Sequence, residues 1–188
     1  MMIAGVEGTL RSVTDDSVIV EVGGISLRLL VPASTLVVLG PCGSRVQLHT
    51  HLQVREESLA LYGFASAEEL RLFELLITVS GIGPRLALAV LSGLSPERFA
   101  LAVASEDTGT LSSISGVGKK TAGRIVLELK GKFDKEGLGL PYPHEDVRSA
   151  LLGLGFSVAE AARAMAALPD PSDLPLEDRL KIALKHLS

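Results

Sequence analysis

The chain has 188 residues, of which 47% are hydrophobic, and its formal net charge is −4 at pH 7. This much apolar sequence supports packed cores and excludes global disorder, while no apolar run approaches the roughly 20 residues of a membrane-spanning helix. The N-terminus lacks the pattern of a secretory signal and the single Cys42 excludes an internal disulfide, so we expect a protein of the reducing cytoplasm without a membrane partner.

Residues 3–64 alternate apolar and polar side chains, which is the pattern of β-strands. In SVIVEVGGISLRLLV, Val18, Val20 and Val22 share one face, and Gly23-Gly24 interrupts the alternation as a hairpin turn does. SLALYGF adds a further short strand, and RVQLHTHLQV places four apolar residues on one face: Val46, Leu48, Leu52 and Val54. Several short strands in about 60 residues predict a small closed or half-closed barrel.

Residues 65–133 change to helical spacing, with Leu70, Phe73, Leu76 and Ile77 on one stripe. Another helix is expected after Ser95, because serine is a good cap and Pro96 suits a first turn. From Lys119 onward a third stripe consists of Ala122, Ile125, Val126, Leu129 and Phe133.

Residues 134–144, DKEGLGLPYPH, are rich in glycine and proline and predict a linker. Residues 145–188 follow as a small helical unit with breaks at 153–155 and 169–175. A unit of about 45 residues is marginal alone, so we expect it to gain stability by docking on a partner.

One motif occurs twice in the helical segment. SGIGPRLALAVL contains Gly81 and Gly83, and 35 residues later SGVGKKTAGRIV contains Gly116 and Gly118. A helix start leaves backbone N–H groups unpaired and carries partial positive charge, and glycines before it let a phosphate approach the backbone. Basic residues follow both copies: Arg85, Lys119 and Lys120. The pair therefore predicts contacts with a nucleic-acid backbone that do not depend on base sequence.

Two other interpretations of this motif are a structural turn and a nucleotide-binding site. A single Gly-x-Gly is most simply a turn between packed helices, but the duplication and the matching basic residues favour an anion site. GVGKKT also resembles the end of a nucleotide-binding P-loop, yet Ser113 occupies the first glycine position and Lys120 the position of the metal-binding hydroxyl. We therefore exclude an ATP site there and expect no cofactor.

The remaining polar residues indicate no chemistry by themselves. Glu56 and Glu57 are expected at the tip of a hairpin, where carboxylates are ordinarily solvated. His49 and His51 share a face of one strand, but without a third ligand they predict no metal site. Because no pairing of a nucleophile with a histidine can be assembled, we do not predict an enzyme.

Together these stretches resemble one family. SGIGPRLALAVLSGLSPERF and ISGVGKKTAGRIVLELK are similar to the paired helix-hairpin-helix motifs of the RuvA family of Holliday-junction-binding proteins. MIAGVEGTL and HTHLQVREESLALYGF resemble its oligonucleotide-binding (OB) barrel, and LLGLGFSVAEAARA resembles its C-terminal module. The resemblance implies an α+β multidomain chain with an OB-fold barrel at 1–64, a tandem helix-hairpin-helix domain at 65–133, a linker at 134–144 and a three-helix, ubiquitin-associated-like domain at 145–188.

The resemblance also implies a function. It implies a homotetramer, or an octamer on DNA, that holds a four-way junction open and nearly flat for branch migration in recombination and DNA repair. The implied protein partners are the RuvB ring ATPase, bound through the C-terminal domain, and a junction resolvase. Since the motor hydrolyses ATP in that family, this chain would be a non-catalytic DNA-binding subunit.

Carried to this sequence, the resemblance assigns roles to individual residues. Eight would contact the DNA backbone: Gly81, Gly83, Arg85, Gly116, Gly118, Lys119, Lys120 and Arg55. Glu56 and Glu57 would form an acidic pin at the centre of the junction. Leu151, Leu154 and Phe156 would bind the motor, although the sequence leaves open which of them form the core instead. The alternatives are a plain nucleic-acid-binding module without a motor and an accessory domain of a nuclease or glycosylase.

Overall fold

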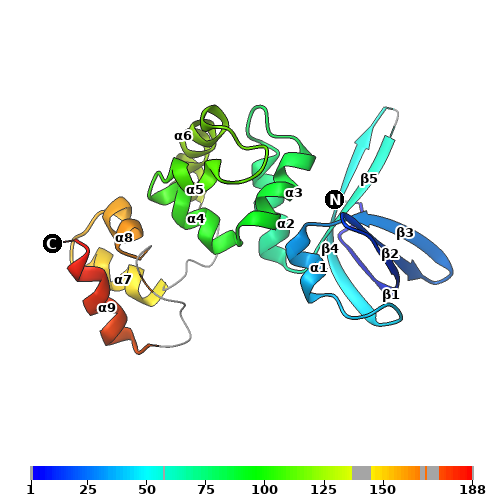
Figure 1. Cartoon of the computed structure of the whole chain (residues 1–188), viewed down its shortest axis with the longest axis horizontal. Coiled ribbons are helices and arrows are strands. Elements are labelled where there is room, and N and C mark those ends of the chain that lie inside the picture. The colour runs from blue at the N-terminus through cyan, green and yellow to red at the C-terminus, as the bar shows by residue number, and fades with distance from the viewer. Residues whose placement is uncertain (1, 57, 137–144, 166–167, 169–173, 188) are drawn as a thin grey trace. The chain divides into compact units, whose positions relative to one another are not determined.

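A computed structural model describes residues 2–56, 58–136, 145–165, 168 and 174–187 (Figure 1). The chain divides into two compact units, residues 1–95 and 96–188. The division falls inside the segment 65–133 that the sequence predicts as one helical domain, and the predicted domain boundaries stay predictions.

The first unit contains a closed barrel whose strands follow the order β1-β2-β3-β5-β4. The strands are β1 (Gly5–Val13), β2 (Ser17–Val22), β3 (Ile25–Leu30), β4 (Arg45–Arg55) and β5 (Ser58–Phe64). Neighbouring strands are antiparallel, except that β3 pairs in parallel with β5 where Leu30 lies opposite Tyr62. The barrel and the β2–β3 hairpin, in which Val22 lies opposite Ile25, were both predicted from the alternation and are confirmed.

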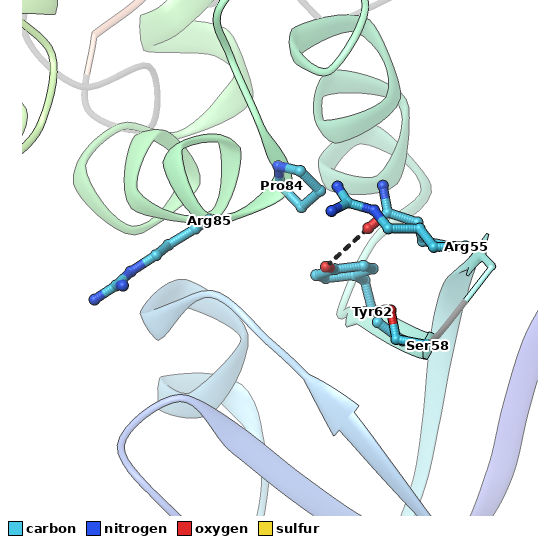
Figure 2. Close-up of a pocket in the computed structure, with 7 residues that line it drawn as sticks. Arg55, Ser58, Tyr62, Pro84 and Arg85 are labelled. Carbon is cyan, nitrogen blue, oxygen red and sulfur yellow. Dashed lines mark hydrogen bonds between the residues drawn. The ribbon is translucent and has the colours of Figure 1, made fainter.

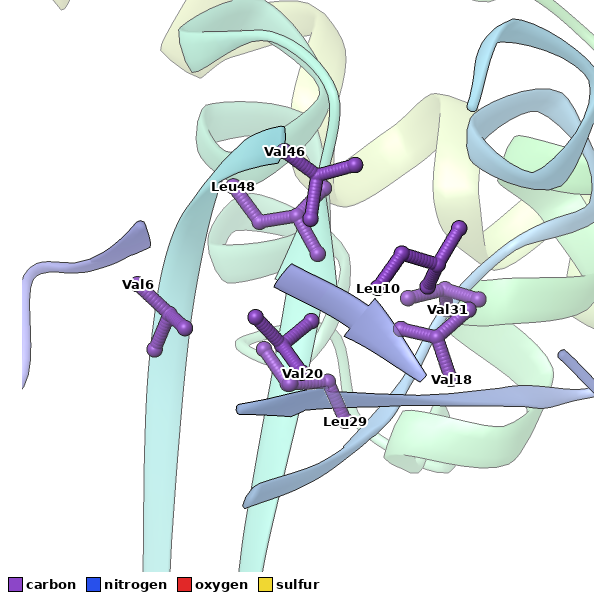
Figure 3. Packing of buried hydrophobic residues seen from close by; sticks show 8 residues of the cluster. All are labelled: Val6, Leu10, Val18, Val20, Leu29, Val31, Val46 and Leu48. Atoms are coloured by element: carbon purple, nitrogen blue, oxygen red, sulfur yellow. The ribbon is translucent and has the colours of Figure 1, made fainter. Parts of the chain in front are cut away.

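The barrel core follows from the same alternation, because successive side chains of a strand point to opposite faces. Figure 3 shows the buried cluster that fills it, contributed by β1, β2, β3, the residue after β3, and β4: Val6, Leu10, Val18, Val20, Leu29, Val31, Val46 and Leu48. Burial of this apolar surface supplies the main driving force for closing the barrel.

The strands β4 and β5 continue past the other strands of the barrel as a two-stranded arm (Figure 1). We call the residues 52–55 and 58–61 the β4–β5 arm. Val46 and Leu48 are buried as predicted, but Val54, expected on the same face, is 65% exposed. The face is continuous along the strand, and only its first part lies over the barrel interior.

Three helices complete the first unit: α1 (Ala33–Val38), α2 (Ala67–Leu76) and α3 (Pro84–Gly93). Phe73 and Leu76 of α2 are fully buried, which confirms the predicted stripe, whereas Leu70 and Ile77 are half-buried at its edge. The short helix α1 was not predicted, since its sequence ASTLVV has β-branched residues and no helical period.

A buried carboxylate, Glu69, connects α1 with α2. Its oxygens accept hydrogen bonds from the Ser34 hydroxyl at 2.6 Å, the Thr35 hydroxyl at 2.9 Å and the Ala65 N–H at 3.0 Å. Thr35 is 0% exposed and Glu69 is 7% exposed, so these bonds replace hydration that both groups lose on folding. The network fixes the start of α2 against the barrel.

The second unit is helical in its described residues. Its helices are α4 (Pro96–Ala104), α5 (Thr108–Ser112), α6 (Lys119–Glu136), α7 (Glu145–Gly153), α8 (Val158–Met165) and α9 (Leu176–Lys185). The predicted stripe of α6 is confirmed at four positions, which are buried: Ala122, Ile125, Val126 and Leu129. The side chain of Phe133 lies outside the described residues, and α6 itself continues to Glu136, into the segment predicted as a linker.

The helices α7, α8 and α9 share a small core. It is formed by Val147, Leu151, Ala161, Ala164, Met165 and Ala183. Arg179 of α9 also donates two hydrogen bonds to the Asp146 carboxylate of α7, at 3.0 Å and 2.5 Å. These bonds lower the pKa of Asp146. Within the described part of the chain, no single helix is both long and apolar enough to cross a bilayer.

Candidate nucleic-acid interface

The first glycine motif forms the turn between α2 and α3. Gly81 has a φ of +85°, in the left-handed region where a side chain is unfavourable. The N–H of Ile82 donates to the carbonyl oxygen of Val79 at 3.0 Å and closes the turn. Gly83 caps α3, and its carbonyl oxygen accepts the N–H of Ala87 at 3.0 Å.

The second motif repeats this geometry between α5 and α6. Gly116 has a φ of +87°. The N–H of Val117 donates to the carbonyl oxygen of Ile114 at 3.0 Å, and the carbonyl oxygen of Gly118 accepts the N–H of Ala122 at 2.9 Å. Each bond lies 35 residues after its counterpart, so the sequence repeat is also a structural repeat.

The packing beneath the two turns is repeated as well. Buried residues of the first copy have a buried counterpart 35 residues later, in the pairs Leu76 and Leu111, Val79 and Ile114, Ile82 and Val117, Ala87 and Ala122, Val90 and Ile125, and Leu91 and Val126. Each turn is therefore held rigidly on two packed helices, which fixes the backbone N–H groups before any ligand arrives.

The second glycine of each motif has no structural reason to be glycine. Gly83 has a φ of −93°, which any residue adopts, and a Cβ added at Gly83 or Gly118 would meet no atom within 4 Å. By contrast, a Cβ on Gly8 of β1 would lie 2.2 Å from the carbonyl oxygen of Glu21. The missing side chains at Gly83 and Gly118 instead leave the start of each helix open to a group from outside the chain.

Positive charge surrounds both helix starts. Arg85 in α3 corresponds to Lys120 in α6, and all three predicted basic residues, Arg85, Lys119 and Lys120, are exposed. Pro84 occupies the position of Lys119 in the first copy, where its missing N–H leaves no helical bond unmade. Unpaired N–H groups, the helix dipole and these charges together attract an anion.

Arg55, the last residue of β4, lies close to the first turn. A cavity of about 280 Å³ is lined by Gln53, Arg55, Ser58, Ala60, Tyr62, Pro84 and Arg85. Figure 2 shows Arg55 next to Pro84, while the Arg85 side chain extends away from it. The buried Tyr62 hydroxyl donates to Gln53 at 3.4 Å, and burial raises the pKa of the Tyr62 phenol, against an opposing effect of the Arg55 charge.

Glu56 follows Arg55 directly and is exposed at the end of the β4–β5 arm. It lies where the sequence predicts, at the tip of a hairpin. Glu57, its predicted companion in the acidic pin, lies outside the described residues.

Three models of known protein domains match successive parts of the chain. Residues 2–63 match the RuvA N-terminal domain, residues 73–132 a SAM-like helix-hairpin-helix tandem, and residues 143–188 the RuvA C-terminal domain. A curated relative from Dehalococcoides mccartyi (strain CBDB1) is 44% identical over 192 residues, covering 100% of this chain and 99% of the relative. Relatives from Herpetosiphon aurantiacus and Roseiflexus sp. (strain RS-1) are 44% and 42% identical, with coverage of at least 98% on both sides. All three are named Holliday junction branch migration complex subunit RuvA.

The chain belongs to the RuvA family. The resemblance drawn from the sequence is therefore confirmed, and so is the fold class: a closed barrel, a helix-hairpin-helix tandem and a C-terminal helical domain. The roles of individual residues in this RuvA-family chain stay predictions.

Of the two strand histidines of this RuvA-family chain, His51 contacts α2. Nδ1 of His51 lies 3.0 Å from the Glu74 carboxylate, and its ring meets Phe73 edge-on with centroids 5.4 Å apart. His51 thus connects β4 with α2. Among the residues that the structure describes, no group of three or more histidine, cysteine or acidic side chains is placed to hold a metal ion.

The predicted motor-binding residues also separate by burial. Leu151 is 0% exposed in the core of α7, α8 and α9, and Phe156 packs partly against that core. Leu154, just beyond α7, is 61% exposed. Leu151 therefore belongs to the core and Leu154 to the surface of this domain, and the motor-binding roles stay predictions.

Glu69 was not identified from the sequence. The signal that could have drawn attention to it is the pattern Ser66-x-x-Glu69, a capping box in which the glutamate is expected to return to the serine N–H. The Ser66 hydroxyl does accept the N–H of Glu69 at 3.1 Å. The carboxylate, however, bonds to Ser34, Thr35 and Ala65, partners that only the folded chain brings near.

Proposed function

We propose that this chain is the non-catalytic DNA-binding subunit of a branch migration complex. As a homotetramer it holds a four-way junction open and recruits a RuvB-type ATPase, in recombination and DNA repair. The observation that carries the proposal is the duplicated hairpin with an unobstructed helix start, in a chain whose full-length relatives are named as Holliday junction subunits.

The hairpins explain how DNA is bound without regard to its sequence. A phosphate oxygen approaching Gly83 or Gly118 meets unpaired backbone N–H groups and no side chain. Arg85 and Lys120 add charge beside these sites. Because such contacts reach only phosphates, every base sequence is bound alike, and affinity falls with salt by about 0.9 log units per log unit for each phosphate neutralised.

The acidic tip of the β4–β5 arm explains a preference for open junctions. A carboxylate at Glu56 repels nearby phosphates, and in a tetramer four such tips would lie around one axis. Repulsion at the crossing point of the DNA strands, together with attraction along the four duplexes of the junction, favours separated strands. The net charge of −4 is compatible with DNA binding, because the distribution of charge and not its sum decides where phosphates bind.

The C-terminal domain supplies the attachment for the motor. Leu154 is an exposed apolar residue on a three-helix core that is complete without it, and apolar anchors of this kind commonly dock into a groove of a partner. The ATPase reaction then belongs to the partner. A junction resolvase and a second tetramer on DNA are further partners that the resemblance implies.

Competition gel shifts test the proposal directly. A labelled four-way junction bound to the full chain is challenged with unlabelled junction or with unlabelled duplex of equal length. We expect the junction to compete far better than the duplex, and Glu56→Gln to reduce that preference while leaving duplex affinity unchanged or higher. Equal competition by both DNAs would leave a plain nucleic-acid-binding module as the function.

A further inference from the structure

One face of the paired strands β4 and β5 changes character along its length. Side chains two residues apart on a strand point to the same face. Four cross-strand pairs therefore share the face that carries Arg55, in order toward the tip: His49 with Phe64, His51 with Tyr62, Gln53 with Ala60 and Arg55 with Ser58. The two inner pairs consist of rings, whereas the two outer pairs, which belong to the β4–β5 arm, carry an amide, a guanidinium group and a hydroxyl.

The inner pairs pack against α2 through one aromatic cluster. The Phe73 ring of α2 lies at its centre, with its centroid 4.9 Å from Tyr62, 4.9 Å from Phe64 and 5.4 Å from His51. Phe64 and Phe73 are 0% exposed, and Tyr62 is 6% exposed. The base of the β4–β5 arm is thus attached to α2 by buried rings.

A hydrogen bond gives this attachment a direction. Nδ1 of His51 lies 3.0 Å from Oε1 of Glu74 in α2. Because an ionised carboxylate only accepts hydrogen bonds, the Nδ1–H of His51 is the donor. Burial of rings is non-directional, whereas a hydrogen bond weakens steeply when its angle changes. The bond between His51 and Glu74 therefore restricts rotation of the strand against α2, which the aromatic cluster alone does not.

Beyond Tyr62 the same face borders the cavity of about 280 Å³, with Pro84 and Arg85 of α3 on its other side (Figure 2). On this face, Arg55 thus extends over open space and not against packed side chains, so the orientation of the arm here is set at its base. Glu56 lies five residues beyond His51, or roughly 16 Å at about 3.3 Å per residue, so a tilt of about 10° at the base would move the tip by about 3 Å.

We propose that His51 and Glu74 are positioning residues for junction recognition. Their hydrogen bond fixes the angle of the β4–β5 arm, and with it the distance from Arg55 and Glu56 to the first glycine turn. This inference rests on the proposed function, in which the arm tip lies at the centre of a junction. A junction contacts both the tip and the glycine turns and depends on their spacing, whereas a plain duplex contacts the turns alone. The bond therefore serves junction geometry and not DNA affinity in general.

Energy transfer between dyes on two duplexes of a four-way junction tests the proposal, measured with the full chain at saturating concentration. Glu74→Leu removes the acceptor, so the junction should be held less open and its distribution of transfer efficiencies should broaden. Because Glu74 is 37% exposed, junction affinity should fall only roughly five-fold, which is about 1 kcal/mol at about 1.4 kcal/mol for each factor of ten. Duplex affinity, measured by fluorescence anisotropy, should stay unchanged.

Three further variants separate the hydrogen bond from general effects. Glu74→Gln keeps an acceptor oxygen and should restore the natural distribution and affinity. His51→Leu removes the donor from the other element and should repeat the effect of Glu74→Leu, and the two changes together should do no more than either alone. The matched control is Glu21→Leu, which changes the net charge equally and breaks an ion pair with Arg11 at 2.7 Å between β1 and β2. It should behave as the natural chain does.

Several results would overturn the proposal. Natural junction opening in both Glu74→Leu and His51→Leu would show that the bond does not set the arm. Equal weakening on junction and duplex, or the same loss in Glu21→Leu, would show a general effect on the fold. Failure of Glu74→Gln to restore opening would assign the effect to charge and not to the hydrogen bond. A natural chain that does not open junctions would instead contradict the proposed function itself, and that result appears before any substitution is made.

Discussion

Replacement of Glu69 by alanine should weaken the contact of α2 with α1 and with Ala65, which follows β5. The change removes the acceptor for the Ser34 hydroxyl, the Thr35 hydroxyl and the Ala65 N–H. Ser34 is half-buried and can turn to water, and the Ala65 N–H keeps a bond to the Thr35 oxygen at 3.1 Å. Thr35 is 0% exposed, so its hydroxyl proton loses its partner without gaining water.

The size of the effect follows from these partners. A buried polar group left without a partner costs about 1–3 kcal/mol, and a hydrogen bond to a charged group contributes about 1.5–3 kcal/mol. The groups that water can reach recover part of this, which leaves about 3 kcal/mol. That corresponds to an increase of roughly 150-fold in local opening, at about 1.4 kcal/mol for each factor of ten.

Hydrogen exchange followed by mass spectrometry reads this opening in the full chain. Peptides covering α1 and α2 should lose protection by about that factor, and Glu69→Gln, which keeps one acceptor oxygen, should lose less. The control is Glu68→Ala in the same first turn of α2, because Glu68 is less buried than Glu69 and its ion pair with Arg71 at 2.7 Å is a surface pair worth at most about 1 kcal/mol. If Glu69→Ala opened the region no more than Glu68→Ala, the argument from burial would be wrong.

Three further predictions concern the second unit. Leu151→Ala should destabilise the C-terminal domain by about 2–5 kcal/mol in thermal unfolding, since Leu151 is fully buried, whereas Leu154→Ser should keep its stability and lose capture of the ATPase in a pull-down. Hydrogen bonds from the Thr110 hydroxyl and N–H lower the pKa of Asp107, the cap of α5. Their stabilisation is present above the unfolded value of about 4 and is lost as pH falls through the folded pKa, so exchange protection of α5 should fall on acidification, and fall less in Asp107→Asn. Lys120→Gln should weaken binding to junction and duplex alike and make the salt slope shallower by about 0.9, as measured by fluorescence anisotropy.

The periodic pattern of apolar residues within single segments was sufficient to predict most of the fold. The alternation around Gly23-Gly24 predicted the β2–β3 hairpin, and the stripe from Ala122 to Leu129 predicted the buried face of α6. Both features depend on a period within one segment, which the sequence displays directly.

Features that depend on distant partners were not predictable in this way. Glu69 is buried because Ser34 and Thr35 fold onto it, and nothing near residue 69 indicates those partners. Val54 has the same apolar pattern as Val46, but only the closed barrel shows that one is inside and the other beyond its end. The candidate site shows the same limit of local pattern. Arg55 and Arg85 were identified from the sequence, but only the fold shows that they line one cavity.

The central claim is that the two open helix starts bind the DNA backbone, and one affinity measurement tests it most directly. Gly83→Ala with Gly118→Ala places a Cβ in empty space, so the fold should remain, yet that Cβ occupies the approach to the N–H groups. The matched control is Gly153→Ala, at the end of α7, where a Cβ also meets no atom within 4 Å. By anisotropy with a labelled junction, the double variant should bind roughly 10- to 100-fold more weakly, from the loss of charge-assisted bonds, and the control should bind normally. Unchanged affinity in a correctly folded double variant would contradict the account.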